Sequence, residues 1–436
     1  MSRYLRYLKR SLPLSLRSMA GVISLLAGIL IAACGSDTTP TAPPTSTQMP
    51  DAPAATVPST SPSVHDLVGG SPALFGAAFK DAVAGSQHRP TSEFAAAAQP
   101  LADGEKLKVG FIYVGSRKDL GYNQAAFEGS QWLETHLDNV EVINAENIPE
   151  TADVQAVARQ MIENGATIIF ATSFGYSGPI KEIAPNYPEV IFLHQGDVES
   201  LENYGAYFGN IWQLEYTAGQ MAGSMTESNK LGFIAAFPTP QTLLNVNAFH
   251  LGARSVNPEV ETTFVLTSDW CDPAKQVTAV QTMIDSGIDV LTQHQDCTKT
   301  IVEAAEREGI FVTGYHQDAS PAGPNSWLTG AAWNWGPVYA ELVGEIRDGT
   351  YQSSIMFVGL DAGWVKLSPF GDFVPTDVTQ LALDTVEELR SNTLQPFTGP
   401  IMDQDGTVRI ADGESPSDAE LQTIDYLVEG ITGRTQ

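Results

Sequence analysis

The sequence predicts an α/β protein built from two units, each with its own parallel sheet. From residue 107, short apolar runs alternate with amphipathic helical patterns, and after about 120 residues the alternation begins again. Near-continuous apolar strands that alternate with helices are typical of parallel sheets covered on both faces. The part from residue 106 to residue 436 is about 330 residues long, more than one core usually spans. We therefore expect two doubly wound, Rossmann-like lobes.

Each unit contributes four candidate strands. Those of the first unit are 108–114, 140–148, 166–172 and 189–196, and between them lie the candidate helices 123–137, 154–165 and 179–188. The second unit has candidate strands 230–238, 261–267, 289–295 and 309–316, with candidate helices 242–256, 273–287 and 298–309. Ligands of such sheets bind beyond the carboxyl ends of the strands. The loops there are polar or aromatic, for example "GSRKDLGYN", "SDWCDP" and "HQDCTK", which predicts a cleft between the lobes.

The N-terminal part has the pattern of an exported protein. Residues 1–33 contain five basic residues, no acidic residue and an apolar run from 19 to 33, which is typical of a signal peptide and shorter than the roughly 20 residues of a transmembrane helix. The run ends in "IAAC" and resembles a bacterial lipoprotein signal, so we expect lipidation at Cys34. Residues 34–105 are rich in Pro, Thr, Ser and Ala and are expected to form a disordered tether. The protein is thus expected on the extracytoplasmic face of the cell membrane.

Charge and motif content restrict the function. The formal charge is −28, and removal of the five basic residues of the signal makes it −33, so binding to nucleic acid is not expected. The sequence has no phosphate-binding glycine motif and no G-x-S-x-G nucleophile elbow, and its seven histidines lack metal-site spacing. We therefore expect binding without turnover, with no catalytic residue, no cofactor and no metal.

Several segments occur in an order that resembles a known family. "DLGYNQAAFEGS", "ATSFGYSGPI", "NAFHLGARSVNPEVE" and "LTGAAWNWGPVY" are similar to the basic membrane protein (BMP) family, the PnrA-like purine nucleoside receptors of ABC importers, over nearly all of residues 106–436. The resemblance implies a type I periplasmic-binding-protein fold, with three hinge crossings near 227–230, 317–327 and 350–356. The first lobe would comprise 106–229 and 327–352, and the second 230–316 and 353–436. Implied partners are a purine base or nucleoside and the ABC permease and ATPase subunits, and we expect a monomer.

The resemblance and the strand ends together give nine candidate ligand residues. They are Asp119, Tyr122, Asn123, Phe174, Asp197, Asn210, Trp270, His316 and Trp333. In the family the D-x-[GS]-[FWY]-N turn contacts the ligand, so Asp119 and Asn123 would hydrogen-bond it and Tyr122 or Phe174 would face the base. Structural roles remain open for several of them: Asn123 and Asn210 as helix caps, and the aromatic residues as core packing.

This chain departs from the family at two positions. Where many members have G-x-D-x-D it has "GYHQD", with His316 in place of the first acid, and where they have T-S-x-x-K it has "TGAAW", with Trp333 in place of the lysine. In the family these positions look like ribose ligands. Losing both keeps the local charge balance and removes sugar hydrogen bonds, so the ligand could be a free purine base or another flat heterocycle.

Cys271 and Cys297 follow successive strands of the second unit, in an exported protein where disulfides persist. A bridge between them is favoured, although the expected strand order separates the two strand ends by about 9.6 Å, beyond the ~7 Å that a bridge tolerates between Cα atoms.

Two other functions fit the same anchor. One is a ligand-sensing receptor coupled to a membrane signalling protein, and the other is a surface adhesin.

Overall fold

The computed structural model describes residues 106–435, and the predicted signal peptide, Cys34 and the tether lie outside these residues. The described part contains two large sheets that are almost entirely parallel. The alternation of apolar runs and helical patterns therefore gave the correct class, because each apolar run became a strand of one of these sheets.

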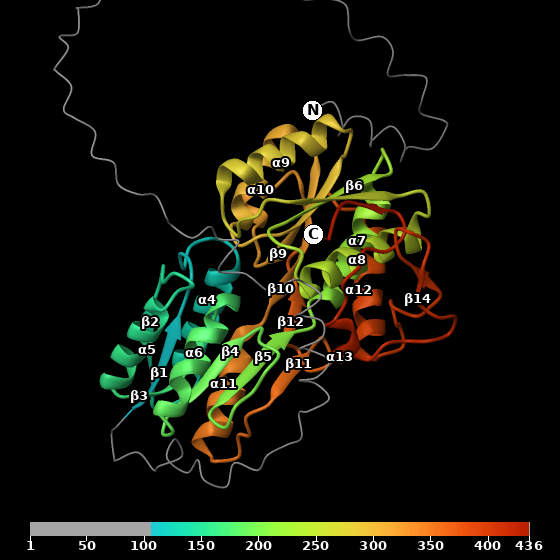
Figure 1. Cartoon of the computed structure of the whole chain (residues 1–436). Coiled ribbons are helices and arrows are strands. Elements are labelled where there is room, and N and C mark those ends of the chain that lie inside the picture. The colour runs from blue at the N-terminus through green and yellow to red at the C-terminus, as the bar shows by residue number, and fades with distance from the viewer. Residues whose placement is uncertain (1–105, 436) are drawn as a thin grey trace, which may run out of the picture. The chain divides into compact units, whose positions relative to one another are not determined.

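The first sheet has six parallel strands, flanked by helices that come mostly from its own βα connections (Figure 1). In spatial order its strands are β11 (Ile355–Val358), β5 (Tyr204–Gly209), β4 (Ile191–Gln195), β3 (Ala166–Ala171), β1 (Leu107–Ile112) and β2 (Val140–Ala145). Its helices are α4 (Tyr122–His136), α5 (Asp153–Glu163), α6 (Ser177–Ile183) and α11 (Trp335–Arg347). Helix α11 packs against α4, and α5 packs on β1 and β3. We call this assembly the first lobe.

The second sheet has seven strands, of which only β12 runs antiparallel to its neighbour. In spatial order they are β12 (Val365–Leu367), β10 (Trp327–Trp333), β9 (Phe311–His316), β8 (Val290–His294), β6 (Lys230–Ala235), β7 (Glu261–Leu266) and β15 (Ile431–Thr432). The helices packed around it are α7 (Trp212–Met225), α8 (Pro240–Val256), α9 (Pro273–Asp285), α10 (Thr298–Glu308) and α12 (Thr376–Arg390). These elements form the second lobe, and the short hairpin β13 (Ile401–Met402) and β14 (Val408–Ile410) and helix α13 (Asp418–Leu421) follow α12.

The chain crosses between the sheets three times, but not where the sequence placed the crossings. Strand β10 pairs with β9 in the second sheet, so residues 327–333 do not belong to the first lobe, and that crossing follows Trp333. Strand β11 pairs with β5 in the first sheet, so the last crossing follows Val358. Helix α7 already packs on α8, which puts the first crossing near residue 210. Strand pairing decides lobe membership, and an apolar run is compatible with either sheet.

One apolar core runs through both lobes. It includes Phe111 and Phe170 of the first sheet and Phe233 of the second, and Trp333 lies at the junction. Two smaller clusters lie on the other faces, under α5 and α6 and under α9 and α10. The continuity of this core indicates that the lobes are in contact.

Candidate functional site

The turn between β1 and α4 is organised by Asp119. Its carboxylate accepts the backbone N–H groups of Gly121 (2.9 Å), Asn123 (3.1 Å) and Gln124 (3.0 Å), and the side-chain amide of Asn123 at 2.8 Å. Burial raises the pKa of Asp119, and these hydrogen bonds oppose the rise. The Asn123 Oδ1 accepts the N–H of Gly115 at 3.0 Å. Both side chains thus fix the turn before α4. Asn123 does so from inside the helix and is not its cap, because the N-cap residue is Gly121.

The same turn docks onto the second lobe. We call residues 119–122 the closing loop. Leu120 packs against the apolar cluster under α9 and α10. Gly121 lies directly on the Asp296 carbonyl, because a Cβ atom built on Gly121 would be 1.6 Å from that oxygen. The Tyr122 ring meets the His316 ring edge-on with centroids 5.1 Å apart. The closing loop therefore brings one lobe's strand end into contact with the other's.

His316 and Trp333, the two departures from the family pattern, are bonded to each other. The Trp333 Nε1–H donates to His316 Nδ1 at 2.9 Å, deep in the protein. Because Nδ1 is the acceptor, the neutral ring carries its proton on Nε2. Burial, with a contribution from His294, lowers the pKa of His316 well below its usual value, so the neutral form is the relevant one. Among the described residues, the Nε2 atom has no hydrogen-bond partner.

Asp296 faces that unpartnered nitrogen. Its Oδ1 lies 4.0 Å from His316 Nε2, which is too long for a hydrogen bond. Burial raises the pKa of Asp296 well above its usual value, and the carboxylates of Asp119, Glu150 and Asp269 raise it further. The sequence marked the loop "HQDCTK" as a strand-end loop but did not single out this residue. The available signal was its position, directly after β8.

Aromatic rings surround the pair. Trp333 stacks on Trp335 with centroids 4.8 Å apart and an interplanar angle of 19°, and meets Phe208 of the first sheet edge-on at 4.8 Å. Trp270 lies 6.0 Å from the His294 ring and 5.2 Å from Phe237. Flat apolar faces, a buried donor and a buried carboxyl group occur together here, which is the chemistry that holds a small heterocycle.

The loops bearing Trp270 and Asp296 are joined covalently. Cys271 and Cys297 form a disulfide with Cα atoms 5.1 Å apart. Strand β6 does lie between β7 and β8, as the sequence analysis expected, so the two loops bend toward each other beyond the strand ends. The Asp296 N–H also donates to the Trp270 carbonyl at 2.9 Å.

Comparison with known proteins identifies the family. Residues 106–398 match the Bmp family, described as ABC transporter substrate-binding proteins of the PnrA-like type. The chain belongs to this family. A purine-binding protein of Brucella abortus (strain 2308) is 36% identical over 328 residues, covering 75% of this chain and 93% of the relative. A Haloferax volcanii protein named "putative ABC transporter glucose-binding protein" is 30% identical over 332 residues, covering 76% of this chain and 82% of the relative.

The Bmp-family chain has the type I periplasmic-binding-protein fold, which a solved structure shares. An ABC transporter solute-binding protein from Conexibacter woesei superposes with a TM-score of 0.56 at 24% identity, over 66% of this chain and 97% of that chain. Within residues 106–435, no helix is long and apolar enough to cross a membrane. The same residues contain no group of three or more His, Cys, Asp or Glu side chains arranged to hold a metal ion.

Two other candidates of this Bmp-family chain lie in loops of the first lobe. Asp197 accepts from the hydroxyls of Ser177 (2.6 Å) and Tyr204 and pairs with Lys181 at 3.3 Å. Burial alone would raise its pKa, but His194 and these hydrogen bonds outweigh burial and the pKa is lowered. Its bonds are therefore made within its own lobe. Phe174 begins the short 3-10 helix Phe174–Tyr176 that follows β3, and its side chain is 42% exposed.

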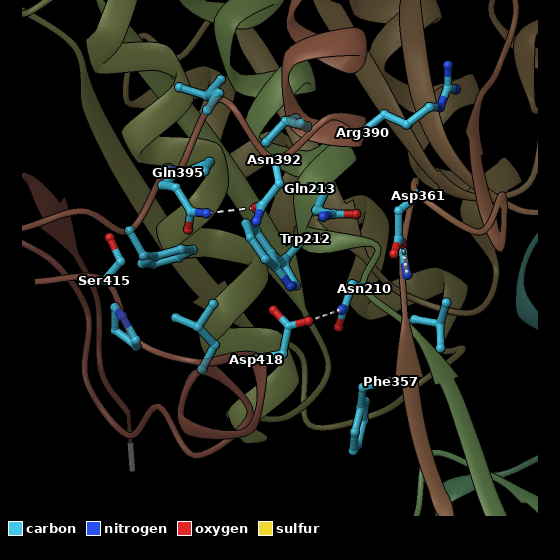
Figure 2. A pocket seen from close by; sticks show the side chains of 18 residues that line it. Asn210, Trp212, Gln213, Phe357, Asp361, Arg390, Asn392, Gln395, Ser415 and Asp418 are labelled. Atoms are coloured by element: carbon cyan, nitrogen blue, oxygen red, sulfur yellow. Dashed lines mark hydrogen bonds between the residues drawn. The ribbon is translucent and has the colours of Figure 1, made fainter.

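Asn210 lies in a pocket formed at the crossings. Its amide donates to Asp418 at 2.9 Å and its carbonyl accepts from Gln422 at 3.2 Å. Figure 2 shows this pocket, with Asn210 beside Asp418 and the indole of Trp212 nearby. It has a volume of about 260 Å³, and none of the other eight candidates lines it. Asn210 thus connects the first crossing to the C-terminal part and makes no side-chain cap on α7.

Proposed function

We propose that the protein is an extracytoplasmic receptor that captures a purine base between its lobes and presents it to the permease of an ABC importer. The observation that carries the proposal is the buried Nε2–H of His316, which has no acceptor within residues 106–435 and lies beside the Asp296 carboxyl group. A purine offers ring nitrogens that accept and N–H groups that donate, and this pair supplies the complementary groups. Tyr122 and the tryptophans add the flat faces on which a base can pack.

The His316–Trp333 bond favours the base over the nucleoside. An acid and a lysine at these positions would each direct several polar atoms to a sugar. Here Nδ1 and Nε1 satisfy each other, so two hydrogen-bonding groups are no longer available to hydroxyls. A ribose would have to be buried without those partners, and an unpaired buried hydroxyl costs roughly 1–3 kcal/mol. The name of the Brucella relative supports a purine ligand.

Lipid anchoring and delivery to a permease complete the proposal. The "IAAC" sequence at Cys34 and the Pro/Thr-rich tether would hold the receptor at the membrane and let it reach a permease. Family membership in the ABC substrate-binding proteins supports that partner.

Calorimetric titration tests the ligand. Adenine, hypoxanthine and guanine are compared with adenosine, inosine, guanosine and glucose, after unfolding and refolding have removed any carried-over ligand. We expect the bases to bind at least about tenfold more tightly than their nucleosides, a difference of about 1.4 kcal/mol. Tighter nucleosides would refute the base preference. Binding of glucose alone would refute the purine assignment, and the name of the Haloferax relative makes glucose the informative competitor.

A further inference from the structure

The disulfide lies at the surface on which the closing loop docks. We call residues 296–298 the docking segment; it contains the Asp296 carbonyl under Gly121 and the Thr298 Oγ1 atom, 3.4 Å from the position of a Gly121 Cβ. Cys297 is the central residue of this segment. We propose that the Cys271–Cys297 bridge holds the docking segment in the position at which the lobes close, and thereby sets how long a ligand is retained. The claim about ligand retention, which we call the retention half, rests on the proposed function. The claim that the bridge positions the docking segment for closure, the closure half, does not.

Strand geometry explains why a bond is needed at this place. Strands β7 and β8 are separated by β6, so loops leaving their ends start about 9.6 Å apart. The bridge brings the Cα atoms of Cys271 and Cys297 to 5.1 Å. One backbone hydrogen bond, from Asp296 N–H to the Trp270 carbonyl, supports the same approach. Next to Asp296, the Gln295 side chain also donates to the Thr267 hydroxyl at 2.9 Å and accepts from Gln276 at 3.0 Å. Each such hydrogen bond contributes only about 0.5–1.5 kcal/mol net, against about 3 kcal/mol for the bridge. Without the bridge we expect the loops to separate and the Asp296 carbonyl to leave its place.

The other end of the docking segment is fixed independently. The Thr298 hydroxyl donates to the Tyr315 carbonyl at 3.0 Å, which ties the start of α10 to β9. The segment is therefore held on one side by a hydrogen bond to the sheet and on the other by the disulfide. Movement at Cys297 would act mainly on Asp296, the residue that Gly121 contacts.

Across the interface, the closing loop requires an accurately placed partner. The φ of Gly121 is −153°, outside the left-handed region that favours glycine, so the missing side chain is explained by lack of space. A contact this close tolerates only small shifts, because packed interfaces respond to changes of one methylene. Tyr122 on His316 and Glu128 bonded to Gln317 are the neighbouring contacts of α4 with the second lobe.

The first test needs no ligand. Full-length wild type and the Cys271→Ser/Cys297→Ser double variant are compared by hydrogen exchange and mass spectrometry. We expect exchange to rise roughly tenfold in residues 294–300 and, across the interface, in residues 119–124, while helix α5 stays unchanged. A rise confined to the two cysteine loops, with residues 119–124 unchanged, would overturn the proposal. Reduction of the native wild type with dithiothreitol should raise exchange in residues 119–124 as well and covers the case that the double variant folds poorly.

The second test measures retention of adenine by stopped flow. Loss of the bridge should raise the dissociation rate about tenfold with the association rate unchanged, because closure follows binding. General destabilisation would not separate the two rates in this way. Dithiothreitol should reproduce the effect in wild type and have none in the double variant. Equal dissociation rates in wild type and double variant would overturn the proposal. If no purine binds the wild type, the proposed function fails, and the exchange experiment still decides the closure half.

Discussion

Gly121→Ala is the sharpest test of the docked closing loop. The new methyl carbon would lie 1.6 Å from the Asp296 carbonyl oxygen and 2.8 Å from its carbonyl carbon, whereas ordinary contact begins at 3.4 Å. Both partners are backbone, so no side chain can rotate away. The docking segment must retreat by roughly 2 Å or the lobes must stay apart. The open form has no such clash, so the substitution acts on closure and not on folding.

The size of the effect follows from overpacking. Inserting one methyl group into a packed contact costs about 1–3 kcal/mol. If that cost falls on the closed form alone, the affinity for adenine drops about 5- to 150-fold. Calorimetric titration measures the affinity, and the melting temperature of the ligand-free protein should change little. Gly344→Ala in α11 is the matched control, since no atom of the described residues outside its own helical turn lies within 4 Å of its Cβ position. An affinity of Gly121→Ala within twofold of wild type would refute the docked arrangement.

Three further predictions concern a buried hydrogen bond, a buried histidine and the disulfide. Trp333→Phe keeps a ring and removes the donor to His316 Nδ1, so urea unfolding should show a loss of about 1–3 kcal/mol; an unchanged value would contradict the bond. Burial lowers the pKa of His250 to about 4, so the folded protein holds this ring in its neutral form. The contribution of the neutral ring to the free energy of unfolding is fully present above pH 6.5 and is lost as the pH falls toward 4. His250→Asn should therefore shrink the stability difference between pH 7 and pH 5 by about 2 kcal/mol. The Cys271–Cys297 bridge closes a separation of 26 residues, and its removal should lower the free energy of unfolding by about 3 kcal/mol; alkylation of either thiol in native, unreduced protein would show that the bridge is absent.

The sequence predicted the elements better than their assignment to lobes. Strands such as Ala166–Ala171 are recognisable because burial on both faces requires a continuous apolar run. Residues 327–333 and 355–358 were assigned to the wrong sheets, since hydrogen bonding to β9 and β5 depends on the path of the whole chain. The order of β7, β6 and β8 was anticipated, and so was the Cys271–Cys297 bridge, which requires the loops beyond these strands to bend toward each other.

For the site, the sequence showed which residue types could bind a ligand, but it did not show which residues contact each other in the fold. His316 and Trp333 were marked separately as departures from a pattern, and only the fold shows that they bond to each other. From the sequence, Gly121 is only part of a turn, whereas in the fold its missing side chain leaves room for the Asp296 carbonyl of the other lobe. Asp119 has a side chain of the type that binds ligands, and in the fold its carboxylate accepts three backbone N–H groups of its own turn.

The unpartnered groups beside the closing loop explain how a ligand can control closure. Where that loop docks, burial and nearby acids raise the pKa of the Asp296 carboxyl group, and His316 Nε2–H has no acceptor among the described residues. Each of these burials opposes closure when no ligand is bound. Asp296 and His316 lie at the ends of the neighbouring strands β8 and β9 of the second lobe, so their separation of 4.0 Å does not depend on closure. A ligand that donates to the carboxyl group and accepts from Nε2 removes both penalties when the closing loop is docked. Such a ligand binds the closed form more tightly than the open form, which is the condition for shifting the equilibrium. Only a molecule with neighbouring donor and acceptor atoms can bind both the Asp296 carboxyl group and His316 Nε2–H. The free-energy cost of closing without a ligand therefore also contributes to selectivity.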